Sequence, residues 1–499
     1  MGFVQAAVGA IVVYFVTKAI YNLYFHPLSR YPGPLLWRLS QLPQLVVMLQ
    51  GVLPFRIKEL HDKYGDVIRV GPNELSFVDS RAWKDIYPRK DFLRPPQWGA
   101  RPPGVEAHNL ISAPLEIHSR FRKALAPAFS EKATQEYEPT VRKYIDKLLV
   151  RLDETLKPDG DGNEEGVADI FQWLNFTTFD IIGDLSWGRA FHCLDSTKEH
   201  PFIAVLLHFK VALIATVIKH FPALDALMPY ITPASALNML HNVIKTGQQR
   251  IQERKESVAE KKDVIAYLTQ YNESCVPEAR MTDEEIEQNT LTIIVAGSET
   301  LTTALTGAFH YLLMENEKLG ILSEEIRSTF GSEEQITGAK LAGLPYLNAV
   351  LSEALRLCPP LPDSLRRRVP KGGATIAGHT LHEGVTVATA CWSQLQSASH
   401  FSEPESFAPE RWLHGGPSKT FPNHDAKAFY PFSLGPHGCL GQSLAWLEMR
   451  MILALLVWRY DFSLPLGSAG EKAANGWRAQ KIYWTWEKAP LLVRIRRAT

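Results

Sequence analysis

The chain has 499 residues, of which 45% are hydrophobic and 21% are charged, so its composition excludes a disordered protein and allows a large buried core. Lys plus Arg and Asp plus Glu both number 53, and this zero net charge gives no global field that would attract nucleic acid. No internal repeat and no long linker divides the sequence, so we expect one large domain after the N-terminus.

The first element is an uncharged apolar run over residues 1–17, which continues to Phe25 past Lys18 and Asn22. As a helix, this run would measure about 35 Å, against about 30 Å for the hydrocarbon core of a bilayer. No basic segment precedes the run and no small-residue cleavage site follows it, so the sequence predicts a retained membrane anchor over residues 1–26 rather than a removed signal peptide. A buried or interfacial helix is the alternative.

Basic residues follow the core of this apolar run, at Lys18, His26, Arg30 and Arg38. Because positive charge tends to stay on the cytosolic side of a membrane, their position predicts that the rest of the chain lies in the cytosol. The prolines within residues 31–34 then end the helix, since proline cannot continue one.

Short β-prone runs alternate with long helical patterns in the rest of the chain. Residues 66–70 and 74–78 flank a Gly-Pro-Asn turn and predict a β-hairpin. A proline-rich irregular segment over residues 92–114 leads to a helix that contains His118 and Arg122. Further β-prone patches lie at 374–390 and 481–496, and the charged run 250–263 is typical of a solvated helix face. The sequence therefore predicts a mainly α fold with minor β-sheets.

A long helix is predicted from the capping-box pattern Thr282-Asp-Glu-Glu285, and it continues without proline to about Met314. Such a helix of about 30 residues would be about 45 Å long and could cross the whole domain. Its middle, residues 296–300, reads AGSET between apolar stretches. Gly297 costs about 1 kcal/mol relative to alanine inside a helix, which requires a reason such as close approach of a cofactor.

Two polar residues in this helix have a possible chemical role. Thr300 can donate to a carbonyl one turn earlier and open a groove in the helix. Glu299 could then carry protons to a ligand in that groove. The alternative is a polar patch that faces solvent.

Glu353 and Arg356 lie three residues apart, on one face of a predicted helix that ends at prolines. Alone, this spacing is typical of an ordinary surface ion pair. The later segment FAPERW offers a second arginine, Arg411, and two guanidinium groups can hold one carboxylate in a stable buried arrangement. We therefore expect these three residues to meet.

Cys439 lies in the segment FSLGPHGCLG, residues 432–441. The glycines on either side would let the backbone approach a flat cofactor, and an apolar helical segment follows, whose N-terminus would lower the pKa of the thiol. A thiolate held in this way suits iron. The other cysteines show no zinc or disulfide spacing, which favours a reducing compartment, and are predicted to be small buried side chains: Cys193, Cys275, Cys358 and Cys391.

Together these motifs resemble the cytochrome P-450 family of heme-thiolate monooxygenases over nearly the whole chain. Residues 24–34 (YFHPLSRYPGP) and 70–77 (VGPNELSF) are similar to microsomal fungal members of secondary metabolism, including the trichothecene hydroxylase group. The resemblance implies a cytochrome P-450 fold over a catalytic domain of residues 27–499, preceded by a single transmembrane helix. It also implies a single-pass protein of the endoplasmic reticulum membrane with the catalytic domain on the cytosolic side.

The resemblance assigns a role to each candidate residue. Cys439 matches the iron ligand, and Glu299 and Thr300 match the catalytic pair of the oxygen-binding helix. Glu353, Arg356 and Arg411 match a structural triad. The remaining cofactor contacts are expected at His118, Arg122, Arg367, His437, Phe432, Gly435, Gly441, Ala296 and Gly297. His437 stands where arginine is usual, and Gln442 stands where many relatives carry lysine.

The implied cofactor is heme b, with electrons that come from NADPH through a cytochrome P-450 reductase. The implied reaction is hydroxylation or another oxidation of a lipophilic small molecule by dioxygen, in the biosynthesis of a terpenoid, polyketide or alkaloid. Expected pocket walls are the 92–114 loop, the 200–230 region, Ile293, Ile294 and residues 362–365, where Asp363 could pair with a basic nitrogen or be a solvated turn residue. The alternatives are a heme-thiolate isomerase or dehydratase and a non-catalytic, membrane-anchored heme-binding protein.

Overall fold

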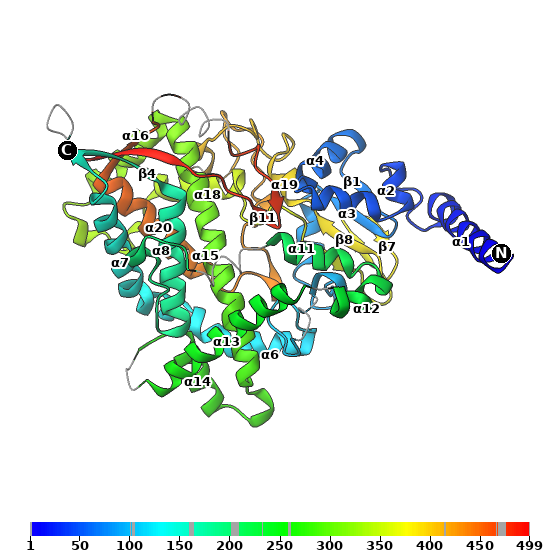
Figure 1. Cartoon of the computed structure of the whole chain (residues 1–499). Coiled ribbons are helices and arrows are strands. Elements are labelled where there is room, and N and C mark those ends of the chain that lie inside the picture. The colour runs from blue at the N-terminus through cyan, green and yellow to red at the C-terminus, as the bar shows by residue number, and fades with distance from the viewer. Residues whose placement is uncertain are drawn as a thin grey trace.

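The protein is described by a computed structural model over residues 2–99, 101, 105–158, 164–200, 209–231, 233–257, 261–413, 416–465, 467 and 476–498. Helices predominate and the sheets are small, as the sequence predicts (Figure 1). The α-helices are α1 (Gly2–Ile20), α2 (Leu35–Leu39), α3 (Leu42–Leu49), α4 (Leu53–Tyr64), α5 (Arg81–Ile86), α6 (Leu115–Leu125), α7 (Glu131–Asp153), α8 (Ile170–Trp187), α9 (Cys193–Ser196), α11 (Phe209–Ile218), α12 (Pro222–Ile231), α13 (Ala234–Glu256), α14 (Val264–Ser274), α15 (Asp283–Met314), α16 (Asn316–Thr329), α17 (Gly338–Leu341), α18 (Pro345–Leu357), α19 (Cys391–Leu395) and α20 (Gln442–Arg459).

Among the described residues, the strands form two four-stranded sheets and two hairpins. The predicted hairpin is confirmed, because β1 and β2 pair antiparallel and begin the first sheet. That sheet has the order β1 (Val67–Gly71), β2 (Glu74–Phe77), β8 (Thr386–Thr389) and β5 (Arg367–Arg368). The second has the order β3 (Lys157–Pro158), β4 (Glu164–Asp169), β12 (Leu492–Arg497) and β9 (Tyr460–Ser463). The hairpins are β6 (Ala374–Ile376) with β7 (His379–Leu381), and β10 (Ile482–Tyr483) with β11 (Thr485–Trp486).

Helix α15 crosses the middle of the molecule and packs against α8, α18 and α20 (Figure 1). Its predicted start is confirmed, since the Glu285 N–H donates to Thr282 Oγ1 at 3.3 Å and the Thr282 N–H donates to the Glu285 carboxylate at 3.0 Å. This reciprocal capping satisfies two backbone donors at the helix start. The helix then runs for 32 residues to Met314, and nearly all of its second half is buried. The main hydrophobic core surrounds it.

The N-terminal helix α1 leads directly into a π-helical turn, η1 (Tyr21–Phe25). Arg69 of β1 is completely buried and donates to the carbonyl of Asn22 at 2.7 Å. In return, the side-chain amide of Asn22 donates to the carbonyl of Leu39 at 3.1 Å. These two bonds fix the end of the N-terminal helical run to the body of the protein.

The sequence predicts that residues 1–26 span a membrane, and in this range the structure has α1 and η1. Within the described part of the chain, no helix combines the length and the apolar character needed to cross a membrane.

Helix α20 contains a buried charge that the sequence analysis missed. Glu448 is 1% exposed, and neither of its carboxylate oxygens has a hydrogen-bond partner among the residues that the structure describes. Burial raises the pKa of Glu448 well above its ordinary value. The folded protein therefore binds a proton at this carboxyl more tightly than the unfolded chain does.

We expect Glu448→Gln to stabilise the protein near neutral pH. In the wild type, the favourable neutral carboxyl is fully available below about pH 4, and the free energy of unfolding falls as the pH rises above that value. The glutamine keeps the shape and carries no proton to lose, so the variant should be more stable by about 1 kcal/mol or more at about pH 7, and equal at about pH 4. Thermal unfolding across pH measures the difference. Glu324→Gln, at an exposed position of α16, is the control; a Glu448 variant that shows the same pH dependence as the wild type would contradict the expectation.

Candidate active site

The predicted ligand cysteine lies in a tight loop that precedes α20. The backbone N–H of Cys439 donates to the carbonyl of Phe432 at 2.8 Å and closes the loop. Gly435 has a φ of +68°, and a Cβ at this position would lie 2.4 Å from the carbonyl oxygen of Tyr87, so only glycine fits. Gly441 is the N-cap of α20, and Cys439 is exposed. The loop thus presents the sulfur just before the start of a helix.

The acidity of this thiol differs from the sequence prediction. Although the side chain has accessible surface, protein atoms surround it closely, and this desolvation raises the pKa of Cys439 above its ordinary value. The backbone of Gly441 and the charge of Arg122 lower the pKa by smaller amounts. Proximity to a helix N-terminus is therefore not sufficient to produce a thiolate here. A bound metal cation would supply the missing stabilisation, since metal ligation deprotonates a thiol.

Basic side chains from three segments surround His437. His118 of α6 is 3% exposed, and its ring centroid lies 4.1 Å from that of His437. Arg122, on the same helix, donates to a backbone carbonyl of the cysteine loop at 2.7 Å. Arg367 of β5 is also buried, and Arg94 lies in the irregular segment after α5. The structure therefore brings together His118, Arg122, Arg367 and His437, as predicted, and adds Arg94.

These neighbours create a strongly positive site. Burial, followed by the charges of Arg94, His118, Arg367 and Arg122, lowers the pKa of His437 to about 2. Its Nδ1 atom is buried and has no hydrogen-bond partner in the described part of the chain. Among the described residues, no carboxylate neutralises these three arginines. An unpaired buried polar atom among uncompensated cations indicates a site for an anionic group.

On α15, the polar segment opens to one side of the helix. The Thr300 hydroxyl donates to the carbonyl of Ala296 at 2.6 Å, so the predicted bond to the preceding turn is confirmed. Ala296 is exposed and Thr300 is partly exposed, whereas residues 301–310 are entirely buried. The helix therefore has an accessible face in its middle, one turn long, with a hydroxyl at its edge.

Glu299 points away from solvent, which rules out the alternative of a solvent-facing polar patch. Its side chain is 6% exposed and forms an ion pair with Lys488, whose side chain is 3% exposed. Lys488 comes from the turn between β11 and β12, far along the chain. The sequence analysis missed this lysine, because no local pattern connects it to α15.

Gly297 has a different structural reason from the one expected. A Cβ at this position would lie 2.8 Å from two side-chain atoms of Ile182 on α8. The glycine thus permits the close packing of α15 on α8, and this gain offsets its low helix propensity. Its predicted contact with a cofactor stays a prediction.

The three residues of the predicted triad meet in a fully buried network. Arg356 Nε and Nη2 donate to the Glu353 carboxylate at 2.9 and 2.8 Å, and Arg411 Nε donates to it at 3.1 Å. Trp412 Nε1 is a further donor, at 2.8 Å, which the sequence analysis did not predict. Burial opposes ionisation of Glu353, but the charges of Arg356 and Arg411 outweigh it and lower the pKa of the carboxyl. The surface ion-pair alternative is therefore wrong, since Glu353 and Arg356 are 0% exposed.

This geometry agrees with a match to a family model. Residues 27–485 match the model described as "Cytochrome P450". The chain belongs to the cytochrome P450 family. It is therefore an oxidoreductase, and it uses the heme b cofactor of that family, with electrons supplied from NADPH through a reductase.

Several curated P450 relatives come from fungi. "Trichothecene C-15 hydroxylase" of Fusarium sporotrichioides is 35% identical over 489 residues, which covers 97% of this chain and 96% of the relative. "Averantin hydroxylase" of Dothistroma septosporum is 35% identical over 497 residues and covers 98% and 90%. Among solved structures, the "cytochrome P450DA heme domain" superposes with a TM-score of 0.73 at 18% identity, over 91% of this chain and 95% of that one. The predicted resemblance to fungal P450 enzymes, including the trichothecene hydroxylases, is confirmed.

The described residues fit heme b. Cys439 would supply the thiolate ligand once iron is bound, and the cations around His437 would hold the two propionate groups of the porphyrin. The accessible face at Ala296 and Thr300 is on a different element, and no hydrogen bond between described residues joins it directly to the cysteine loop. The sulfur and the hydroxyl thus come from two separate elements: the cysteine loop carries the sulfur, and α15 carries the hydroxyl.

Arg94 lies beside His437, the histidine that stands where an arginine is usual. We therefore expect Arg94 to contribute to heme binding. Burial lowers the pKa of Arg94 to about 10, and the side chain still donates to the carbonyl of Leu110 at 3.2 Å. We expect Arg94→Gln to remove a charge-assisted contact worth about 1.5–3 kcal/mol, so that heme is lost to an apo-globin acceptor at least about tenfold faster. Arg101→Gln, an exposed position of the same segment, is the matched control. An unchanged rate of heme loss in Arg94→Gln would contradict this role.

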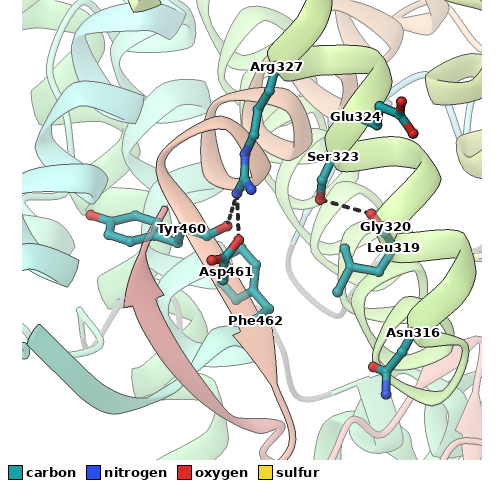
Figure 2. A pocket seen from close by; sticks show the side chains of 9 residues that line it. All are labelled: Asn316, Leu319, Gly320, Ser323, Glu324, Arg327, Tyr460, Asp461 and Phe462. Atoms are coloured by element: carbon teal, nitrogen blue, oxygen red, sulfur yellow. Dashed lines mark hydrogen bonds and ion pairs between the residues drawn. The ribbon is translucent and has the colours of Figure 1, made fainter. Parts of the chain in front are cut away.

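A concave region of the surface lies between α16 and β9, far in the sequence from the residues described above. Figure 2 shows its lining, in which Arg327 pairs with Asp461 at 2.8 Å and donates to the carbonyl of Tyr460 at 3.0 Å. The Ser323 hydroxyl donates to the carbonyl of Leu319 in its own helix. The lining contains none of the predicted site residues, and its arginine is already paired. We therefore do not assign the active site to this cleft.

Proposed function

We propose that this P450 is a membrane-anchored monooxygenase that hydroxylates a lipophilic intermediate of fungal secondary metabolism. The observation that carries the proposal is the neighbouring acid and hydroxyl of Glu299 and Thr300 on the central helix, beside an accessible face. When bound, heme b supplies the iron centre at which dioxygen is activated and one oxygen atom is transferred to the substrate.

The chain's own residues would support this chemistry in three ways. Cys439 would ligate the iron, and the basic residues around His437 would hold the propionates. The Thr300 hydroxyl would hold a proton at the accessible face of α15, and Glu299 would direct protons toward that face. Isomerising and dehydrating relatives need no such proton delivery, so the presence of both groups supports monooxygenation.

The ion pair of Asp363 in the expected pocket wall supports a substrate without a basic nitrogen. Asp363 pairs with Arg366 at 3.2 Å, and Arg366 also pairs with Glu74 at 2.8 Å, so the carboxylate is not the solvated turn residue considered from the sequence. Arg366 stacks on the ring of Trp98 at 4.2 Å. Asp363 is therefore already engaged in an ion pair with a buried arginine, which disfavours its use for a basic alkaloid nitrogen. Terpenoid or polyketide skeletons fit better.

Parts of the expected pocket walls lie outside the described residues, namely residues 100, 102–104 and 201–208.

Exposed apolar side chains support the proposed anchor of residues 1–26 and the catalytic domain of 27–499. They gather on α1, on α2 and α3, and on α12, which lie toward one end of the molecule (Figure 1). Helix α11 contacts both α3 and α12, so these elements are neighbours. Exposed apolar side chains that gather on neighbouring helices are typical of membrane contact. We propose that these side chains face the endoplasmic reticulum membrane from the cytosolic side, where the reductase would also be bound. The exposed members include Val12, Val13, Phe15, Leu35, Leu36, Leu42, Leu224, Leu227 and Tyr230.

The function is tested by expression of the full chain with a cytochrome P450 reductase and feeding of a terpenoid and polyketide library. Monooxygenation adds one oxygen atom to a fed compound, and the product must depend on NADPH. A product of unchanged mass identifies an isomerase, and loss of water identifies a dehydratase; either result would overturn the proposal. NADPH consumption without any oxygenated product in the presence of a compound that shifts the heme spectrum would do the same.

A further inference from the structure

The ammonium group of Lys488 is buried and fully hydrogen-bonded within the protein. It forms the ion pair with Glu299, and it donates to Thr303 Oγ1 at 3.1 Å and to the carbonyl of Trp486 at 3.3 Å. These three acceptors use the three N–H donors of the ammonium group. The nitrogen also lies 5.7 Å from the ring centroid of Phe171 on α8. Among the described residues, these are the groups that face the ion pair.

The position of Lys488 in the chain is unusual for a buried charge. The residues on either side of it, Glu487 and Ala489, are exposed, and the side chain turns inward from this surface turn. A lysine here could reach solvent without loss of hydration. Instead it crosses to α15, where Thr303 lies one turn after Glu299 and also donates to the Glu299 carbonyl at 2.9 Å.

Stability alone does not explain this arrangement. The desolvation of two buried charges largely cancels their attraction, so apolar residues of similar size generally stabilise a protein equally well or better. A buried pair is well suited, in contrast, to fix one partner in position and in its ionised state. The partner that Lys488 fixes is the residue next to Thr300, whose hydroxyl lies at the accessible face of α15.

We propose that Lys488 is a positioning residue for proton delivery, which holds the Glu299 carboxylate in one orientation on the oxygen side of the active site. This inference rests on the proposed function, because it assumes that Glu299 directs protons during oxygen activation. Lys488 acts through Glu299. The C-terminal turn between β11 and β12 is thereby part of the catalytic apparatus.

The test compares coupling, the amount of product formed per NADPH consumed, in the full-length enzyme with its reductase. Lys488→Met should lower coupling about tenfold and release hydrogen peroxide instead, since misdirected protons uncouple oxygen activation. Lys488→Arg keeps the charge and should restore most of the coupling. Lys481→Met, at an exposed position of the same C-terminal segment, should leave coupling unchanged.

A second measurement does not depend on turnover. Lys488→Met leaves the buried carboxyl of Glu299 without its ion-pair partner, so this variant should unfold at a lower denaturant concentration than the wild type. Glu299→Gln/Lys488→Met removes both partners and should recover most of that loss, and its coupling should be no worse than that of Glu299→Gln alone.

The outcomes separate the two proposals. Wild-type coupling in Lys488→Met, or additive losses in the double variant, would overturn the positioning role while Glu299 kept its own. Wild-type coupling in Glu299→Gln would instead overturn the role of Glu299 in the proposed function, and the role of Lys488 with it. Two results together would support the inference. Coupling should fall in Lys488→Met but not in Lys488→Arg. The double variant should couple as well as Glu299→Gln alone.

Discussion

Cys439→Ser should abolish oxygenation and the thiolate-type band in the carbon monoxide difference spectrum of the reduced protein. Burial already opposes ionisation of the thiol at this position, and a serine hydroxyl loses its proton far less readily than a thiol does. The variant therefore cannot supply the electron-rich sulfur that favours O–O cleavage. Product formation should fall to background, while the scaffold of Arg122 and the cysteine loop should still fold.

Cys275→Ser is the control for this substitution, because Cys275 is a partly buried free thiol at the end of α14. It should keep both the spectral band and turnover. Heme content measured by the pyridine hemochromogen distinguishes loss of the sulfur ligand from loss of the cofactor. A thiolate-type band that persists in Cys439→Ser would show that another cysteine binds the iron.

Glu353→Gln should destabilise the protein by about 3–5 kcal/mol, because it removes the negative charge between two buried arginines. Arg356 and Arg411 would then lie within a few ångströms of each other with no counter-charge. Each also donates to backbone carbonyls of the segment after α19, so that segment should loosen with the network. Chemical unfolding gives the stability, and the yield of heme-containing protein gives the consequence for the site.

The matched control is Glu405→Gln in the same segment. Glu405 pairs with Arg478 at 2.9 Å, but its side chain is 73% exposed. An exposed pair of this kind contributes at most about 1 kcal/mol, so the control should unfold almost as the wild type does. Equal losses of stability in the two variants would contradict the buried network as the source of the effect.

Local patterns predicted those parts of the structure in which neighbours along the chain decide the outcome. The capping box of Thr282 and Glu285 and the hairpin of β1 with β2 depend on residues within a few positions of one another. The bond from Thr300 to Ala296 likewise spans one helical turn. The triad of Glu353 was predictable at longer range because two arginines in known motifs match one carboxylate.

The residues that were not predicted from the sequence share a different property. Each acts through contacts with residues that lie far away in the sequence. Lys488 reaches Glu299 from a surface turn, and Arg94 reaches the surroundings of His437 from an irregular segment. Glu448 is buried by the helices that pack around α20, although its own helix gives no sign of it. The pKa of Cys439 follows the same rule, because burial by the whole fold outweighs the local effect of the helix N-terminus.

Arg69 has a consequence for the way in which the proposed anchored enzyme sits on its membrane. Its buried guanidinium holds the carbonyl of Asn22, so the end of the N-terminal helical run is attached to the body of the protein. Hydrophobic helices respond to changes in bilayer thickness by tilting. Through this attachment, such a tilt would turn the catalytic body, and the thickness of the membrane would influence which part of its surface meets the lipid.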